Sequence, residues 1–282
     1  MARVIVVTHE FDRFTRRRWP FPARGMYMLF DVLKQLEAFG HSWQVTTGTR
    51  EVPGDVALLH VDATVVADDY LALADRYPRT LNFGTGDISK RRVSRLLLTR
   101  GDDWAGPVIV KSDLNCFGGS ERTHNKRARR AGRPLPYSHL PPERPYVVLN
   151  NMSEVEDEVW ADADLVVERF VPERNPDGGY AIRRWVFMGP RERCTRQVTM
   201  DAVARAGRVT RLDHVEVPDK LRSERERLGF DYGKFDFVIH EGEPVLIDAN
   251  RTPGVASRVS EMVRSGARNL AEGLDALVRQ PG

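Results

Sequence analysis

The sequence predicts a mixed fold of the α/β and α+β classes: an open α/β sheet at the N-terminus, followed by units with antiparallel strands. Residues 4–8 form an unbroken β-branched run, which is typical of a strand buried in a parallel sheet. Apolar residues then recur at helical spacing from Met26 to Phe39, and Gly40 follows as a helix-ending residue. Beyond residue 180 the runs resemble antiparallel strands, with a hairpin expected around Glu241 and Gly242.

Length and composition exclude several classes of protein. The 282 residues allow one large domain or two modest ones, and 41% hydrophobic with 29% charged residues is typical of a folded globular chain. A net charge of +3 is too small to imply a nucleic-acid partner without a concentrated patch. Cys116 and Cys194 lie too far apart for a disulfide scaffold or a CxxC site. No apolar stretch reaches membrane-spanning length, so we expect a cytoplasmic protein.

The remaining elements can be placed in chain order. After the first helix we expect strands at 43–47, 56–61 and 80–83 and helices at 68–76 and 89–98. A second, smaller unit should contain strands 108–111, 146–149 and 165–170, with a basic helix-like run between the first two. The third should contain strands 182–188, 196–202, 208–215, 235–240 and 245–248, a helix at 220–228 and closing helices within 255–278. The predicted domains are therefore 1–100, 101–172 and 173–282.

Two of the last strands each carry a carboxylate near one end. Asp236 and Asp248 lie on strands joined by a tight turn, and Asn250 follows on the same side as Asp248 because strand side chains repeat every second residue. Three oxygen ligands of this kind suit Mg²⁺. A polar strand end entering a Pro-Gly turn gives the same pattern, so both interpretations stay open.

Two further segments carry charge at strand ends. Lys111 ends an apolar strand, and Gly118 and Gly119 follow in a loop whose amides would approach a polyphosphate, although a plain turn has the same pattern and the order is not that of a P-loop. Glu168 lies in another apolar strand, where it would contact an adenine, and an arginine on the next strand would hold a phosphate or carboxylate. The alternative for both is a charge that faces solvent.

These three segments, in this order, resemble the ATP-grasp superfamily from about residue 82 to residue 254. The resemblance implies an N-terminal pre-ATP-grasp open α/β domain, a small lid subdomain and a larger C-terminal subdomain, with ATP held between the last two. It also implies Mg²⁺. This chain has Asp248 where the superfamily commonly has Glu, which leaves open whether one ion or two are bound.

The resemblance also assigns roles to residues. It implies that the nucleotide is bound by Lys90 (with Arg91 as alternative), Lys111, Gly118, Gly119, Glu168, Phe170 and Val171, and by Glu173 at the ribose. It implies catalytic roles for Arg184, with Arg183 less favoured, and for Lys234. The implied metal ligands are Asp236, Asp248 and Asn250.

The implied activity is that of an ATP-dependent carboxylate-amine ligase. Such an enzyme phosphorylates a small-molecule or peptide carboxylate, and an amine-type nucleophile then attacks the acylphosphate, with release of ADP and phosphate. The alternative is a kinase of the same fold. A less favoured alternative is a basic module that binds RNA or peptide, based on the arginine-rich runs at 13–24 and 122–133. Neither a membrane nor a nucleic acid is the expected partner, and the oligomeric state stays open, a homodimer included.

Overall fold

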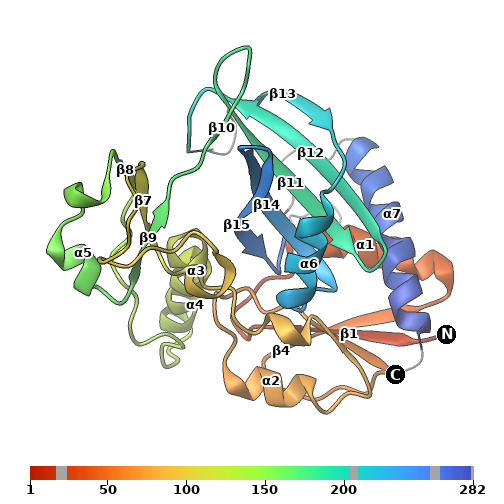
Figure 1. Ribbon diagram of the computed structural model, residues 1–282. Coiled ribbons are helices and arrows are strands. Elements are labelled where there is room, and N and C mark those ends of the chain that lie inside the picture. Colours follow the sequence, from red (N-terminus) through yellow and green to blue (C-terminus); the bar gives the residue numbers. More distant parts are fainter. Residues whose placement is uncertain (17–23, 204–208, 255–260, 281–282) are drawn as a thin grey trace.

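The computed structural model describes residues 1–16, 24–203, 209–254 and 261–280, and its strands form three sheets and one short hairpin (Figure 1). The N-terminal sheet lies at the bottom of this view, the lid sheet at the left and a large antiparallel sheet above. The hairpin consists of β2 (Thr15–Arg16) and β3 (Arg24–Gly25). Arg17, Arg18, Trp19 and Phe21 of the first arginine-rich run lie outside the described residues.

The N-terminal sheet is parallel, with strand order β4-β1-β5-β6. Its elements are β1 (Arg3–Thr8), α1 (Met28–Leu36), β4 (Ser42–Thr47), β5 (Val56–Leu59), α2 (Asp68–Ala74) and β6 (Thr80–Leu81). Val4 to Val7 are fully buried, as expected for a β-branched strand at the centre of such a sheet. Because β1 and β5 are neighbours in register, the residues that follow both strands gather at one edge.

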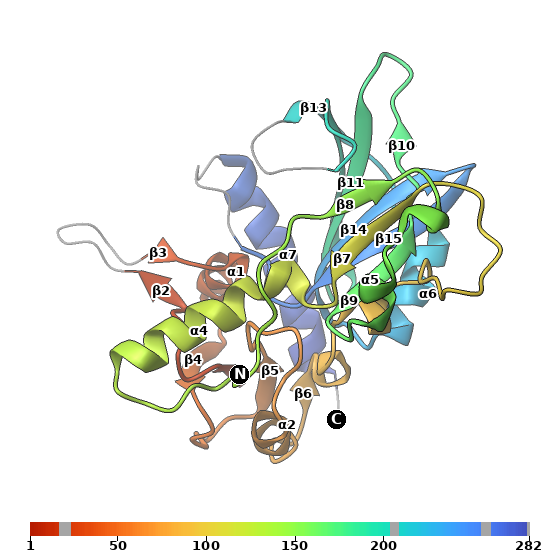
Figure 2. The same ribbon diagram turned by 90° about the vertical axis from the view of Figure 1, so that its left-hand side faces the viewer.

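The lid sheet is antiparallel, with strand order β8-β7-β9. Its elements are β7 (Val108–Ser112), β8 (Val147–Leu149), α5 (Asp157–Ala161) and β9 (Leu165–Arg169). Two short helices join it to the rest of the chain: α3 (Lys90–Val93) before β7, and α4 (Gly119–Arg130) after it. Helix α4 lies along the N-terminal unit (Figure 2), where the His124 ring stacks on His9 with a centroid distance of 4.0 Å.

The large sheet has strand order β13-β12-β11-β14-β15, and β10 pairs with β11. Its elements are β10 (Glu173–Arg174), β11 (Tyr180–Met188), β12 (Arg191–Thr199), β13 (Val209–His214), α6 (Asp219–Arg227), β14 (Tyr232–His240), β15 (Glu243–Asn250) and α7 (Glu261–Arg279). Glu241 and Gly242 have φ values of 51° and 84°, as a two-residue hairpin turn requires, so the predicted hairpin is confirmed.

One hydrophobic core joins the large sheet to the N-terminal unit. Helix α7 contributes Leu270 and Leu274, which pack in the same cluster as Leu29 and Leu33 of α1. Burial of these four side chains holds the two units in a fixed relation, because each contributes roughly 1.5–3 kcal/mol. In the part of the chain that the structure describes, no helix has the length and apolar character needed to cross a membrane.

The prediction of a helix at 89–98 is wrong. Helix α3 covers only Lys90–Val93, and Ser94 is already extended, with φ of −76° and ψ of 140°. The chain beyond it runs beside β9, where the Leu98 amide donates to the Val167 carbonyl and the Arg169 amide donates to the Leu96 carbonyl. The partner strand therefore satisfies the backbone groups that a helix would have used. The predicted domain limits at 100 and 172 stay predictions, and residues 255–260 of the closing segment lie outside the description.

Candidate active site

A cavity of about 190 Å³ lies between the lid sheet and the large sheet. The lid side contributes Ile109, Lys111, Tyr146, Glu168, Phe170 and Val171, and the large sheet contributes Tyr180, Ile182, Asp236, Val238, Ile247 and Asp248. Lys90 of α3 also lines it. The cavity therefore brings together seven residues predicted from the sequence: Lys90, Lys111, Glu168, Phe170, Val171, Asp236 and Asp248.

A β-bulge aims the two aspartates at this cavity. Asp236 of β14 lies opposite Asp248 of β15, but Phe237 pairs with Leu246, so the register shifts at Ile247. Consecutive residues of a regular strand point to opposite faces, whereas here Ile247 and Asp248 both line the cavity. The bulge thus adds an apolar wall beside the carboxylates.

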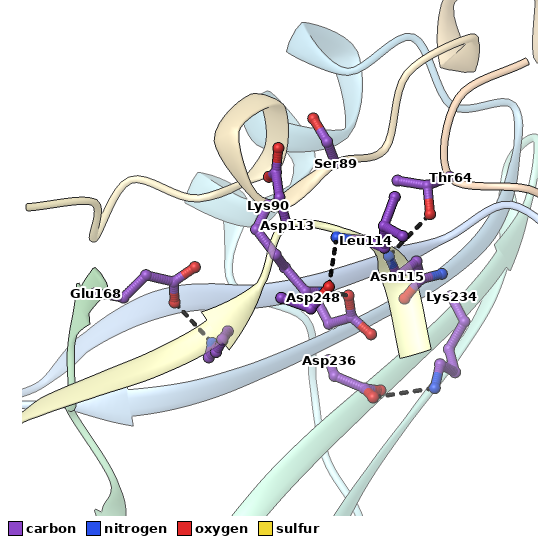
Figure 3. Close-up of polar contacts among 12 residues, drawn as sticks. Thr64, Ser89, Lys90, Asp113, Leu114, Asn115, Glu168, Lys234, Asp236 and Asp248 are labelled. Carbon is purple, nitrogen blue, oxygen red and sulfur yellow. Dashed lines mark hydrogen bonds and ion pairs between the residues drawn. The ribbon is translucent and has the colours of Figure 1, made fainter. Parts of the chain in front are cut away.

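A row of charged side chains crosses three strands next to the cavity. Arg184 of β11 pairs with Asp236, and Asp236 pairs with Asp248. The Arg184 Nε lies 3.8 Å from Asp236 Oδ1, and the Lys234 Nζ donates to Asp236 Oδ2 at 3.0 Å (Figure 3). Lys234 and Asn250 are also a cross-strand pair. Arg184, Lys234 and Asn250 therefore flank the carboxylates rather than line the cavity.

Lys90 is buried against the second carboxylate. Its Nζ donates to Asp248 Oδ1, and the lysine side chain is 3% exposed (Figure 3). Burial alone would lower the pKa of Lys90, but the Asp248 carboxylate raises it above its usual value. Burial would likewise raise the pKa of Asp248, and Lys90 and Lys234 hold it below its usual value. Both groups are therefore charged at neutral pH.

The Arg91 alternative lies elsewhere. The Arg91 guanidinium donates to the carbonyls of Ala163 and Leu165, at 3.0 and 2.7 Å, and its Nε lies 3.2 Å from an Asp113 oxygen. It joins α3 to the start of β9. Of the two candidates, Lys90 and Arg91, it is Lys90 that the structure places at the cavity.

Lys111 and Glu168 form a second buried pair, on adjacent lid strands. The Lys111 Nζ donates to Glu168 Oε2 at 2.6 Å, and the Glu168 side chain is fully buried. Glu168 Oε1 is buried without a hydrogen-bond partner. Phe170 and Val171 follow at the same edge, where Val171 packs with Leu96. A donor on a ligand in this cavity would satisfy the free oxygen.

Gly118 and Gly119 lie outside the cavity wall. Gly118 has φ of 72° and follows Cys116 and Phe117, whose φ values of 46° and 58° are also left-handed. Two such non-glycine residues cost about 1–3 kcal/mol each, which the surrounding structure must offset. The Asn115 amide donates to Thr64 Oγ1 at 2.9 Å and thereby attaches this loop to the N-terminal unit (Figure 3).

Glu173 is not brought to the cavity. Its carboxylate accepts hydrogen bonds from Arg183 at 3.0 Å, from Arg196 at 3.1 Å and from the Ile239 amide at 2.8 Å. Burial opposes ionisation, but these donors lower the pKa of Glu173 below its usual value. Glu173 and Arg183 thus stabilise the pairing of β10 with the large sheet, and the ribose contact expected of Glu173 stays a prediction.

The donor set fits a Mg²⁺ ion. Asp236 Oδ1 is buried and has no hydrogen-bond partner, so an oxygen ligand is free at the centre of the row. Within the described ranges, no three histidine, cysteine, aspartate or glutamate residues gather as a metal-binding group. Mg²⁺ needs only one or two carboxylates when water and phosphate oxygens complete its shell. Asp236 and Asp248 meet that requirement, and the Asn250 side-chain oxygen, two residues further along β15, accepts a hydrogen bond from the Thr252 amide at 2.8 Å.

Several cavity residues were missed from the sequence. Ile109 lies two residues before Lys111, and Tyr180 and Ile182 alternate with Arg184, so strand periodicity would have found all three. Tyr146 carries no such signal. Its ring centroid lies 5.9 Å from the Lys111 Nζ. Burial raises the pKa of Tyr146 to about 12, which keeps its hydroxyl protonated.

No protein-family model matches the sequence, and no curated protein matches it. Solved structures do match, and the three described next are 11–15% identical to this chain. The D-alanine–D-alanine ligase of Bacillus anthracis is 11% identical with a TM-score of 0.50, and the match covers 99% of this chain and 96% of the other. The RimK-domain ATP-grasp protein of Sphaerobacter thermophilus is 15% identical with a TM-score of 0.52 (96% and 99%). The ATP-grasp ligase PsnB, complexed with a minimal precursor, is 14% identical with a TM-score of 0.54 (96% and 98%).

Proposed function

Because the chain has the ATP-grasp fold, we propose that it is an ATP-dependent ligase that joins a carboxylate to an amine through an acylphosphate. One observation carries the proposal: two buried lysines and two facing carboxylates line a single cavity between the lid and the large sheet. This arrangement supplies cations for phosphate oxygens and oxygen ligands for a divalent ion in one place.

The nucleotide lies along the cavity in this proposal. Val171, Val238 and Ile247 provide apolar walls for the base. The free Glu168 Oε1 accepts a hydrogen bond from the exocyclic amine of an adenine. Lys111 and Lys90 contact the phosphates. Gly118 and Gly119 lie outside the cavity wall in this structure, and their loop approaches the phosphates when the nucleotide binds.

Asp236, Asp248 and Asn250 are the proposed Mg²⁺ ligands. When bound, the ion would neutralise charge on the phosphates and fix their orientation. Lys90 and Lys234 place positive charge beside the two aspartates, and they hold the pKa of Asp248 below its usual value, which leaves this carboxylate ionised and able to bind a cation. Two structures of similar fold, a D-alanine–D-alanine ligase complexed with ATP and PsnB complexed with Mg and ADP, support ATP and Mg²⁺ as the molecules bound.

The chain's own residues then position the reaction. The Arg184 Nε makes no hydrogen bond and lies at the end of the carboxylate row, so its guanidinium can hold a γ-phosphoryl oxygen as the acceptor carboxylate attacks. The P–O bond to ADP breaks and the acyl–O–P bond forms. The amine attacks the acyl carbon next, phosphate leaves, and the amine loses a proton to give the amide.

The acceptor acid is a small molecule or a peptide carboxylate. A ligase of similar fold from Chryseobacterium gregarium is complexed with ADP and with a leader and core peptide, at 9% identity and a TM-score of 0.51. That structure and the PsnB complex support peptide carboxylates as the first acceptors to screen.

Hydroxylamine trapping tests the proposal. The protein is incubated with ATP, Mg²⁺, hydroxylamine and each member of a panel of free and peptide carboxylates, and hydroxamate and ADP are measured together. We expect at least one acid to give hydroxamate and ADP in equal amounts. Asp236→Asn should abolish both, because it removes a carboxylate ligand from the cavity.

Asp213→Asn is the matched control. Asp213 is a carboxylate on β13 of the same sheet, where it pairs with Arg211 at the surface. This variant should release ADP at the wild-type rate. A stable phosphorylated product without hydroxamate would replace the ligase with the kinase alternative, and unchanged ADP release by Asp236→Asn would remove the site from the reaction.

A further inference from the structure

Four residues after β5 contact both halves of the candidate nucleotide site. Residues 61–64 follow the carboxyl end of this N-terminal strand, and Val61, Ala63 and Thr64 are buried. The segment belongs to the N-terminal unit, whereas the Mg²⁺ ligands and the glycine loop belong to the other two units. Its side chains and carbonyls nonetheless bind to both.

Asp62 reaches the end of the metal-binding strand. Its Oδ1 accepts a hydrogen bond from the Thr252 hydroxyl at 2.7 Å. The Thr252 amide in turn donates to Asn250 Oδ1 at 2.8 Å, which fixes the orientation of the Asn250 side-chain amide. Tyr27 donates to Asp62 Oδ2 at 2.9 Å and holds the aspartate in place.

Arg251 attaches the same strand end to this segment. The Arg251 side chain is fully buried and donates to the Val61 carbonyl at 3.1 Å and to the Ala63 carbonyl at 2.5 Å. A buried guanidinium that is satisfied by backbone carbonyls requires those carbonyls to stay where they are. The position of Asn250 therefore depends on the backbone of residues 61–64.

Thr64 reaches the glycine loop from the same segment. Its Oγ1 accepts a hydrogen bond from the Asn115 amide at 2.9 Å (Figure 3), and its amide donates to Glu121 Oε1 of α4 at 2.6 Å. These two bonds hold the loop at both ends, on either side of the left-handed residues Cys116 and Phe117. They offset part of the strain in that loop.

We propose that segment 61–64 positions both halves of the site, with Asp62 orienting the metal ligand Asn250 through Thr252 and Thr64 orienting the glycine loop. The inference rests on the proposed function. Asp62 and Thr64 are positioning residues, so each should act on a different binding constant. Loss of Asp62 should weaken binding of the divalent ion, and loss of Thr64 should weaken binding of the nucleotide.

Two binding measurements on the full chain separate these effects. Mn²⁺ affinity in the presence of ADP is measured by electron paramagnetic resonance, and affinity for a fluorescent ADP analogue is measured in EDTA. Asp62→Ala should weaken Mn²⁺ binding about 10-fold, as the loss of a residue that orients a metal ligand does. It should leave the affinity for the ADP analogue in EDTA unchanged. Thr64→Val should weaken the analogue roughly five-fold, the effect of one hydrogen bond.

Conservative variants and one control complete the test. Asp62→Asn keeps an acceptor for Thr252 and should stay within about two-fold of wild type, as should Thr64→Ser. Asp55→Asn is the control, because Asp55 accepts from the Arg3 amide before the other end of β5. We therefore expect Asp62→Ala and Thr64→Val to lose binding affinity, and Asp62→Asn, Thr64→Ser and Asp55→Asn to retain it.

Three outcomes overturn the positioning role while leaving the proposed function intact. In the first, Asp62→Ala binds Mn²⁺ with wild-type affinity. In the second, Asp62→Asn loses as much Mn²⁺ affinity as Asp62→Ala does. In the third, Asp62→Ala and Thr64→Val each lose Mn²⁺ affinity and nucleotide affinity to the same extent. The second outcome would mean that charge rather than the hydrogen bond matters. A wild-type protein that binds neither Mn²⁺–ADP nor the analogue refutes the proposed function as well.

Discussion

Replacement of Lys111 by methionine should leave a carboxylate buried without its partner. The Lys111 Nζ lies 2.6 Å from Glu168 Oε2, and Glu168 is fully buried with its second oxygen already unpartnered. Removal of one member of a buried pair costs about 3–5 kcal/mol, because the remaining charge has lost both water and its counter-ion. We therefore expect Lys111→Met to lower the free energy of unfolding by about that amount in urea at pH 7.

The double variant Lys111→Met/Glu168→Met separates charge from packing. Apolar replacement of both partners removes the unpaired charge, so the free energy of unfolding should return to within about 1 kcal/mol of wild type. Arg100→Met is the control, because the Arg100–Asp157 pair has a similar distance of 2.7 Å but is exposed at both ends. It should cost at most about 1 kcal/mol.

Nucleotide binding should behave differently from stability in the same series. The double variant folds but lacks both the lysine that contacts the phosphates and the Glu168 carboxylate that accepts from the adenine, so it should bind the fluorescent ADP analogue at least as weakly as Lys111→Met does. A loss below about 1 kcal/mol in Lys111→Met would show that water reaches the pair in the folded protein. Full binding by the double variant would refute the assignment of Lys111 to the phosphates.

Three further predictions test other parts of the molecule. Asp248→Asn should lower the free energy of unfolding by roughly 3 kcal/mol at pH 7 because Lys90 loses its counter-ion. Since the pKa of Asp248 in the folded protein is held below its usual value, the ionised carboxylate stabilises the fold above pH ~4, and this stabilisation is lost as the pH falls through that lowered pKa. A stability difference between wild type and Asp248→Asn that persists unchanged to pH 2 contradicts this. Burial raises the pKa of Asp12 to about 6, so wild type loses stability as pH rises from about 4 to 6. Asp12→Asn should remove that loss and gain up to roughly 3 kcal/mol in urea unfolding at pH 7 but nothing at pH 4; an equal gain at both pH values argues against it. Gly273→Ala adds a Cβ that overlaps the Met188 carbonyl oxygen. The thermal midpoint of this variant should therefore fall by the equivalent of about 1–3 kcal/mol, despite the better helix propensity of alanine. A higher midpoint would show that α7 shifts freely.

The strand elements were predictable because burial imposes a simple pattern on them. The run at 4–8 is β1, and the hairpin turn at Glu241 and Gly242 lies where the sequence places it. Helix 89–98 could not be excluded in the same way. Val93, Leu96 and Leu97 recur at helical spacing in the sequence, and only the presence of β9 beside residues 96–98 makes this part of the segment extended.

The candidate site was predictable where strand alternation and motif order both act. Asp236 and Asp248 gather because they face each other across a hairpin, and Lys111 and Glu168 lie on adjacent strands. Glu173 shows the limit, because its neighbours on β11 and β12 engage the carboxylate and turn it from the cavity. The role of Asp62 has no sequence signal at all, since Thr252 lies 190 residues away along the chain.

The most direct test of the account is a crystal structure of the protein with Mn²⁺ and a non-hydrolysable ATP analogue. The account predicts an anomalous peak between Asp236 and Asp248, with the phosphates beside Lys111 and Lys90 and the base against Val171. A metal and nucleotide bound elsewhere on the chain, or a metal that contacts neither aspartate, would contradict it.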